Sequence, residues 1–496
     1  TDLEKILLEK GKKIALDPTL HSIIEIEKVE KMLENSTSQL QLIDKNFVDL
    51  IWENQPKTQY TDIFDHPTSF AGQGRSEKLD ILKKFLDQNE IDHYFVSGLD
   101  NIAWLLNLRA DDIKYTPLLY SYLLISKNNK HSLYIKESAM PEILKKEIQT
   151  LININNIENI RSIFNNINSS ESIGLDFNST TYYFLDLLRK QKISTKNLAN
   201  PCILLKAIKN ETELDGAKKA HIRDGVSITK YIYWLKNIMD PKSNDEISVA
   251  HHLENLRRKN ELFHSLSFDT ISAIDKNAAL PHYRVTEEGK SSFSDNNIYL
   301  VDSGGQYFDG TTDITRTIIL GEATREQKDR FTRVLKGHIA LSNHVFDKGT
   351  KGTDIDYLAR KSLQEINLDY DHGTGHGIGS FLSVHEAPQR IAKKSMFESV
   401  ELLPGMILSN EPGYYKENEY GIRTENLVVI KENNDKKLYF ENISWCPIDL
   451  DLIDSSMLDQ IERHWLNKYH KKVYDTLEKY LEDKERDWLK DATSEV

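Results

Sequence analysis

The chain has 496 residues, of which 39% are hydrophobic and 28% charged, and its formal net charge is −13 at pH 7. This length exceeds what one hydrophobic core usually serves, so two or three domains are expected. The acidic balance argues against a nucleic-acid partner, whose phosphates need clustered Lys and Arg, and no apolar run approaches the ~20 residues of a membrane-spanning helix.

The stretch from Thr1 to Lys13 is charged throughout and lacks the hydrophobic region of a signal peptide. Cys202 and Cys446 are the only cysteines, and no CxxC spacing suggests a zinc or redox site. Reduced thiols are favoured over a chance disulfide. These features together predict a soluble, intracellular protein.

The first sixty or so residues have the pattern of a helical fragment rather than of a complete domain. Apolar residues recur there at helical spacing: Ile23, Ile26, Val29, Met32 and Leu33. Because so short a helix is marginal alone, we expect it to dock on another part of the chain. The polar stretch from Glu53 to Gly74 carries prolines and glycines and is predicted to be a linker.

An α/β pattern begins near Arg75. A helix and three strands are predicted in order, over 79–86, 93–96, 120–125 and 132–135. The Asn- and Ile-rich stretch from Leu151 to Asn168 is biased in composition. Its regular Ile spacing favours an ordered helix-loop segment over a disordered insert.

A second unit is predicted to begin near Lys206. Its opening helix starts at Glu211 and continues as an amphipathic stretch to Leu235. From Leu266 to about Ile430 the pattern changes to strands separated by Gly-rich turns.

The C-terminal tail is predicted to be helical, with one apolar stripe formed by Ile461, Trp465, Tyr469, Val473, Leu477 and Leu481. A coiled coil or a membrane-surface helix is an alternative. Packing of this stripe against the body of the protein is favoured.

Two aspartates lie where predicted strands meet. The run from Asn297 to Asp302 is an apolar strand that closes on a carboxylate, and a turn with three glycines follows over 303–310. The run over 311–320 returns as a second strand, which brings Asp313 back within reach of Asp302. Two close carboxylates repel each other, so both stay ionised cheaply only when a cation lies between them.

A glycine-rich segment carries three histidines within fourteen residues, His372, His376 and His385. Its glycines permit backbone and imidazole to approach a ligand closely. A phosphate-binding loop is a weaker interpretation, because neither a strand-to-helix context nor a P-loop Lys accompanies the glycines. A single His is most often a core residue, whereas three so close together favour a functional site.

Glu411 and Glu425 lie beside apolar strand residues, which indicates that both acids point into buried surroundings where an ionised carboxylate needs a partner. Taken singly, each Glu would more often be a solvated surface charge. Strand alternation places Arg423 on the same face as Glu425. Arg423 can therefore orient a metal-binding carboxylate without itself binding the metal.

Four carboxylates and one imidazole form an oxygen-rich set with enough ligands for two ions: Asp302, Asp313, His376, Glu411 and Glu425. This set suits Mn²⁺, with Co²⁺, Fe²⁺ or Zn²⁺ as substitutes, better than a thiolate zinc site does. Two ions ~3.5–4 Å apart can share a hydroxide nucleophile and stabilise the tetrahedral intermediate of amide hydrolysis.

In this order and context, the five residues resemble the metal ligands of the pita-bread metallopeptidases, which include methionine aminopeptidases, prolidases, creatinases and aminopeptidase P. The strings HGTGHGIGSFLSVHEAP from His372, NEPGYY from Asn410 and YGIRTEN from Tyr420 resemble the eukaryotic, multi-domain aminopeptidase P type. LDNIAWLLNLRADDIKYTP from Leu99 resembles that type's second, creatinase-like domain. The resemblance extends over nearly the whole chain.

The resemblance implies a metalloaminopeptidase that hydrolyses the N-terminal Xaa-Pro bond of peptides through a hydroxide activated by two metal ions. It implies that Asp302 holds one ion and that Asp313 and Glu425 bridge both. His376 and Glu411 would hold the other ion.

Other residues take their expected roles from the same resemblance. His282 matches the histidine that contacts the substrate near the scissile amide, and His385 matches the one that stabilises the carbonyl side and shuttles protons. His372 matches the histidine that lines the proline pocket. Tyr415 and Arg423 are expected to support the site.

The implied fold is a multidomain α/β and α+β protein. We expect a remnant of a first creatinase-like domain plus linker over 1–66, a second creatinase-like α/β domain over 67–205, a pita-bread catalytic domain over 206–450 and a C-terminal helical extension over 451–496. Of the first domain, only the final helices between Lys13 and Trp52 are expected.

Peptides with N-terminal Xaa-Pro are the expected partners, with a homodimer implied and with neither nucleic acid nor membrane. The expected location is cytoplasmic. An additional vacuolar or lysosomal pool is the alternative, because the first domain is expected to be only partly present in the sequence.

Two other functions compete. A prolidase requires a free carboxylate directly after proline, and the HGTGH string and extra domains favour aminopeptidase P over it. A metal-free binding module on the same fold would have lost ligands, and all five are present here.

Overall fold

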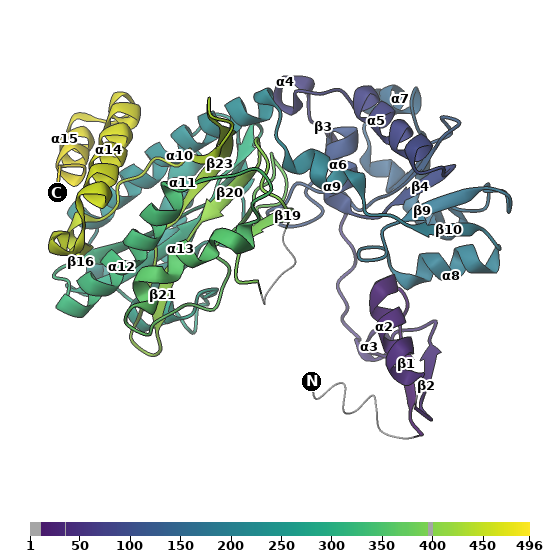
Figure 1. Cartoon of the computed structure of the whole chain (residues 1–496), viewed down its shortest axis with the longest axis horizontal. Coiled ribbons are helices and arrows are strands. Elements are labelled where there is room, and N and C mark those ends of the chain that lie inside the picture. Colours follow the sequence, from purple (N-terminus) through teal and green to yellow (C-terminus); the bar gives the residue numbers. More distant parts are fainter. Residues whose placement is uncertain (1–10, 35, 395–399) are drawn as a thin grey trace. The chain divides into compact units, whose positions relative to one another are not determined.

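The computed structural model describes residues 11–34, 36–394 and 400–496, so most of the charged stretch from Thr1 to Lys13 lies outside the described residues. The chain divides into two compact units (Figure 1). The first comprises residues 1–68, 73–113 and 117–203, and the second comprises 69–72, 114–116 and 204–496. The mixed α/β character of both units confirms the predicted fold class.

The first unit is built on a six-stranded sheet with the strand order β10-β9-β4-β6-β7-β8. The strands are β4 (His93–Val96), β6 (Tyr122–Ser126), β7 (Ser132–Ile135), β8 (Asn153–Asn156), β9 (Ser172–Leu175) and β10 (Ser194–Asn197). Its longer helices are α2 (Ile23–Leu33), α5 (Arg75–Gln88), α6 (Leu99–Leu106), α7 (Glu142–Gln149) and α8 (Tyr182–Lys190). The predicted helix over 79–86 and the strands over 93–96 and 132–135 are confirmed, and the strand predicted over 120–125 begins two residues later.

Three predictions for this unit were wrong in part. The first sixty residues contain helix α2 (Ile23–Leu33) as predicted, but also a parallel strand pair, β1 (Lys13–Leu16) with β2 (Gln39–Leu42). The predicted linker contains the short strand β3 (Phe64–Asp65), which pairs with β5 (Leu108–Arg109), and the whole of helix α4 (Thr68–Ala71), most of which belongs to the second unit. The stretch 151–168 is ordered and contains a 3₁₀ helix, but it also contains strand β8, which the predicted helix-loop segment did not include.

The second unit places long helices against antiparallel sheets. Its larger helices are α10 (Glu211–Asn237), α11 (Glu246–Arg257), α12 (Arg325–Ser342), α13 (Gly352–Gln364), α14 (Gln460–Leu477) and α15 (Asp483–Ala492). Helix α10 begins where Asn210 and Glu213 form a capping box, which satisfies amides of the first turn. The helix predicted from Glu211 is therefore confirmed.

Four antiparallel sheets complete this unit, with the orders β11-β14-β15, β12-β13-β16, β17-β24-β23-β20-β18-β19 and β21-β22. The strands of the two three-stranded sheets are β11 (Phe263–Leu266), β14 (Gly305–Tyr307), β15 (Gly310–Thr311), β12 (Ile271–Ile274), β13 (Asn297–Ser303) and β16 (Ile314–Leu320). The remaining strands are β17 (Val345–Phe346), β18 (Gly375–Gly377), β19 (Glu386–Ile391), β20 (Ile407–Asn410), β21 (Gly413–Lys416), β22 (Tyr420–Arg423), β23 (Asn426–Glu432) and β24 (Leu438–Asn442).

Helix α14 packs on α10 and α12 within the second unit, and Figure 1 shows it in yellow beside α15. Its buried face includes Leu466, Tyr469, Val473 and Leu477, so the prediction that the tail packs against the body is confirmed. Ile461 was wrongly assigned to this face, because it lies in the first turn and is 71% exposed. No helix among the described residues combines the length and apolar character that crossing a membrane requires.

Candidate metal centre and active site

Asp302 and Asp313 come from two strands that pair directly. Strand β13 is antiparallel to β16, and Asp302 lies opposite Thr315. The predicted second strand over 311–320 is interrupted, so that Asp313 falls between β15 and β16 rather than within a strand. The turn between them packs so tightly that a Cβ at Gly304 would lie 1.9 Å from the Thr312 carbonyl oxygen, which explains a glycine there.

His376 lies on the short strand β18 with its ring fixed in one orientation. Its Nδ1 is 3.0 Å from the Gly377 carbonyl oxygen, which can only accept a hydrogen bond, so Nδ1 carries the hydrogen. The lone pair of Nε2 therefore faces the acids, 3.5 Å from Asp313 Oδ2 and 3.4 Å from Glu411 Oε1. This is the arrangement of a metal-binding imidazole with a supporting hydrogen bond.

Glu411 and Glu425 are each held by a hydroxyl group. Glu411 follows directly after β20, and Ser409 Oγ donates to its Oε1 at 3.0 Å. Glu425 lies between β22 and β23, and Thr315 Oγ1 donates to its Oε2 at 2.7 Å. Both carboxylates therefore have one oxygen supported by the protein.

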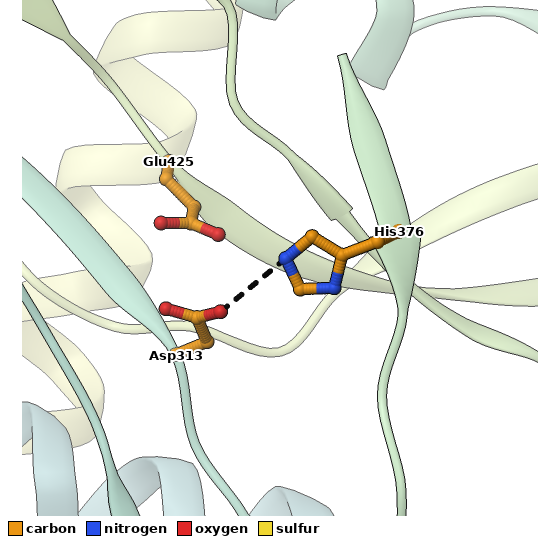
Figure 2. A group of neighbouring side chains, drawn as sticks. All are labelled: Asp313, His376 and Glu425. Atoms are coloured by element: carbon orange, nitrogen blue, oxygen red, sulfur yellow. Dashed lines mark ion pairs between the residues drawn. The ribbon is translucent and has the colours of Figure 1, made fainter. Parts of the chain in front are cut away.

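The ligand atoms of these residues converge. One side-chain atom from each of Asp313, His376 and Glu425 lies within 4.8 Å of the others (Figure 2). Figure 2 shows both carboxylates turned toward the imidazole from two separate segments of the chain. All five predicted ligands line one cavity of about 450 Å³, together with Arg423, His282, His372 and His385.

The protonation of the acids indicates that a cation belongs among them. Burial, followed by the charges of Glu425, Asp302 and Glu411, raises the pKa of Asp313 well above its ordinary range. Burial likewise raises the pKa of Glu411 to about 8. A positive charge among these acids would offset both their burial and their mutual repulsion.

Unsatisfied atoms point to the same conclusion. Among the described residues, Asp302 Oδ1, Asp313 Oδ1 and Glu425 Oε1 are buried without a hydrogen-bond partner. Buried carboxylate oxygens without donors are costly unless they bind a cation. The donor set, rich in oxygen with one imidazole, fits two divalent ions of the Mn²⁺ type.

Arg423 connects the metal-facing acids to the rest of the site. Its Nη2 donates to Asp302 Oδ2 at 2.7 Å, and its Nη1 donates to the Tyr415 hydroxyl at 2.7 Å. Tyr415 is not among the cavity-lining residues. Its hydroxyl lies 2.8 Å from Nε2 of His372, which does line the cavity, so Tyr415 supports the site through a hydrogen bond to that ring.

The three other histidines lie around the acids. Burial and the charge of Arg423 lower the pKa of His372 to about 3, so this ring is neutral. The His385 ring meets the His376 ring edge to face, with centroids 4.3 Å apart, and burial lowers its pKa. His282 lies on an exposed loop whose residues also line the cavity.

The structure adds residues that sequence reasoning missed. Ser409 lies two positions before Glu411, the ligand that it supports, and Thr315 lies two positions after Asp313 while its hydroxyl supports Glu425. Strand alternation puts residues two positions apart on one face. This two-residue spacing from an acid was the feature of the sequence that could have pointed to Thr315 and Ser409. Arg390 also lines the cavity, because it pairs with His376 across strands β18 and β19.

Comparisons with known proteins agree with this geometry. Residues 215–432 match the metallopeptidase family M24, residues 54–213 match the creatinase/prolidase N-terminal domain, and residues 436–496 match the C-terminal region of peptidase M24. A probable Xaa-Pro aminopeptidase P of Sordaria macrospora is 39% identical over 508 residues, covering 98% of this chain and 82% of the relative. A protein of the same description from Pyrenophora tritici-repentis is 37% identical over 507 residues, covering 98% and 85%.

Solved structures show the same likeness. The X-prolyl aminopeptidase of Caenorhabditis elegans, described as a cytosolic enzyme with a di-nuclear active site, superposes with a TM-score of 0.92 at 31% identity and covers 99% of this chain and 82% of its own. The prolidase of Pyrococcus horikoshii superposes with a TM-score of 0.59 at 24% identity over 75% of this chain and 99% of its own. The second likeness concerns the fold alone.

Proposed function

Because this chain belongs to the M24 metallopeptidase family, among its Xaa-Pro aminopeptidase P members, we propose that it removes the first residue from peptides with proline in second position. The observation that carries this proposal is the convergence of Asp313, His376 and Glu425 in one cavity with Asp302 and Glu411. Unsatisfied carboxylate oxygens in the same cavity support a metal-dependent reaction.

In this proposal the five ligands would be divided between two ions. Asp302 would hold one ion, His376 and Glu411 would hold the other, and Asp313 and Glu425 would serve both. Mn²⁺ is the proposed metal, with Co²⁺, Zn²⁺ or Fe²⁺ as substitutes. When bound, two such ions polarise the scissile carbonyl and make a water molecule nucleophilic near neutral pH.

The protein side chains bind and orient the peptide. An Xaa-Pro bond has no N–H, so recognition of its ring relies on shape. His372 forms one wall of that pocket. Its ring is fixed, because its two nitrogens are hydrogen-bonded to the Tyr415 hydroxyl and the Gly373 carbonyl oxygen. His282 contacts the substrate near the scissile amide, and His385, beside His376, moves protons on the carbonyl side.

Further assignments belong to the same proposal. The four segments 1–66, 67–205, 206–450 and 451–496 remain the proposed domain organisation, supported by the division of the chain into compact units between 203 and 204. A homodimer and a cytoplasmic location are proposed as well. The description of the Caenorhabditis elegans relative as cytosolic supports the location.

Three peptides test the proposal: Arg-Pro-Pro, Arg-Ala-Pro and the dipeptide Arg-Pro, each with Mn²⁺ supplied. A misfit in an apolar pocket costs ~1–3 kcal/mol in kcat/KM, so replacing Pro by Ala at the second position should cost at least about ten-fold. Arg-Pro-Pro should be the best substrate. Equal cleavage of the first two peptides would contradict the proline pocket, and a strong preference for Arg-Pro would indicate a prolidase.

A further inference from the structure

Glu246 is a buried carboxylate that neutral donors surround. It is the first residue of α11 and is fully buried. Its Oε1 accepts from Ile274 N at 2.7 Å and Asn277 Nδ2 at 3.0 Å, and its Oε2 accepts from Ser291 N at 2.8 Å and the Tyr283 hydroxyl at 3.0 Å. A buried carboxylate is tolerated when donors satisfy its oxygens in this way.

These donors belong to the two ends and the middle of one loop, residues 274–291. Ile274 ends β12, Ser291 closes the loop, and Tyr283 lies between them. The closing end is held twice, because Glu246 N also donates to the Ser291 carbonyl oxygen at 3.2 Å. One carboxylate therefore fixes the path of the whole loop.

The loop is also held from the side of the metal centre. A Cβ at Gly421 would lie 1.8 Å from the Ala278 carbonyl oxygen, so β22 and the 3₁₀ turn over 275–279 are in direct backbone contact. Strand β22 ends at Arg423, which binds Asp302. The loop thus lies between the Glu246 carboxylate and the strand that supports a metal ligand.

The same loop carries His282, which lines the catalytic cavity although it is exposed. His282 directly precedes Tyr283 in the sequence. The Tyr283 hydroxyl contacts both Glu246 and the Gly289 carbonyl oxygen, the latter at 3.1 Å. The hydrogen bonds of the Tyr283 side chain therefore restrict the backbone of its neighbour, His282.

We propose that Glu246 is a positioning residue, which holds His282 at the substrate through the hydrogen bond from Tyr283. This inference rests on the proposed function, in which His282 contacts the substrate near the scissile amide. Misplacing a substrate-contacting group by about 1 Å can cost about 10²-fold in rate. Such support matters on a loop with many exposed residues, because solvent-exposed segments open more readily than packed ones.

A double-mutant cycle with Mn²⁺-loaded protein and Arg-Pro-Pro tests the proposal. Tyr283→Phe keeps the ring and removes one hydroxyl, and it should lower kcat/KM by about three- to ten-fold while the bound metal is retained. In a His282→Ala background the same substitution should change kcat/KM less than about two-fold, because the positioned group is gone. Tyr420→Phe is the matched control, since its hydroxyl donates to Glu326 at 2.7 Å on the opposite face of β22 from Arg423.

A second variant, Glu246→Gln, repeats the test at the carboxylate itself, and amide hydrogen exchange gives a measurement that does not depend on turnover. Glu246→Gln keeps the shape but turns one acceptor into a donor, so its loss of kcat/KM should exceed that of Tyr283→Phe, again only when His282 is present. In the Tyr283→Phe variant, amide hydrogen exchange should increase in residues 274–291 more than elsewhere. The activity of the unchanged protein on Arg-Pro-Pro separately tests the proposed function.

Three outcomes would overturn the positioning role. The first is normal kcat/KM in Tyr283→Phe, and the second is an effect of Tyr283→Phe that multiplies with that of His282→Ala. The third is unchanged hydrogen exchange across residues 274–291. A general structural role for Glu246 would lower thermal stability in both backgrounds without this dependence on His282.

Discussion

At the scale of single residues, Thr315 joins two charged groups of the metal centre. Its hydroxyl donates to Glu425 Oε2 at 2.7 Å and accepts from Arg423 Nε at 3.2 Å. Thr315→Val keeps the shape but leaves a buried carboxylate oxygen without its donor. Loss of such support typically costs ten- to hundred-fold in metal affinity, so the Mn²⁺ dissociation constant should rise by about that factor.

The matched control for this prediction is Thr332→Val. Thr332 is buried in α12, where its hydroxyl donates to the Lys328 carbonyl oxygen at 2.7 Å and does not contact the metal ligands. Mn²⁺ titration should show unchanged affinity in this variant. Equal affinities in both variants would contradict the role of Thr315.

The acids of the site also predict how pH acts on metal binding. Burial raises the pKa of Glu411 from 4.5 to about 8, and the pKa values of Asp313 and Glu425 are raised well above their ordinary range. A carboxyl with a raised pKa binds more protons in the folded than in the unfolded protein between the two pKa values. For Glu411 this window extends from about pH 4.5 to about pH 8. The contribution of Glu411 to metal-free stability therefore falls as pH rises through that window, and the raised pKa values of Asp313 and Glu425 act in the same direction.

Metal ions replace these protons, so metal affinity should increase as pH rises through the same window. The measurement is the difference in melting temperature with and without Mn²⁺ at pH 5.5, 6.5, 7.5 and 8.5. We expect the difference to grow steadily with pH. A difference that stays constant over this range would show that the acids are already ionised without metal.

The five residues that line the cavity as proposed ligands could be singled out from sequence through strings such as HGTGH around His376 and GIRTEN around Glu425. Thr315 and Ser409 could not, because a hydroxyl residue two positions from an acid is common and only the fold decides whether it turns toward that acid. The support of His282 by Glu246 was equally invisible, since the two residues are far apart in the sequence and their link depends on how α11 packs beside the loop.

At the scale of elements, helix α14 offers a direct comparison of its two faces. Leu466 is fully buried against the core, whereas Ile461, five residues earlier, is 71% exposed. Leu466→Ala should lower the free energy of unfolding by about 2–5 kcal/mol, while Ile461→Ala should change it by less than about 0.5 kcal/mol. Chemical denaturation measures both. Similar losses would mean that α14 presents another face to α10 and α12.

Elements with strong periodicity were predictable, and short polar ones were not. The amphipathic helix from Glu211 and the apolar strand β13 follow from hydrophobic pattern alone. Strand β8 has the sequence NINN, which propensity disfavours, and it forms because it pairs in parallel with β7. The β1–β2 pair likewise depends on a partner strand more than twenty residues away.

At the scale of the whole molecule, every proposed ligand and supporting residue belongs to the second compact unit. They come from segments between Glu246 and Glu425, so the antiparallel sheets of this unit assemble the centre from distant parts of the chain. The unit therefore contains both the acids that need cations and the histidines proposed to act on the peptide. Removal of the metal ions should consequently abolish peptide hydrolysis.

Reconstitution with metal tests this central claim most directly. The purified protein is stripped with a chelator, Mn²⁺ is returned in known equivalents, and hydrolysis of Arg-Pro-Pro is followed. We predict no hydrolysis by the metal-free protein and a rise in activity that levels off at two ions per chain, as a two-ion site requires. Hydrolysis without metal, or a protein that binds the peptide but neither takes up metal nor cleaves it, would contradict the account.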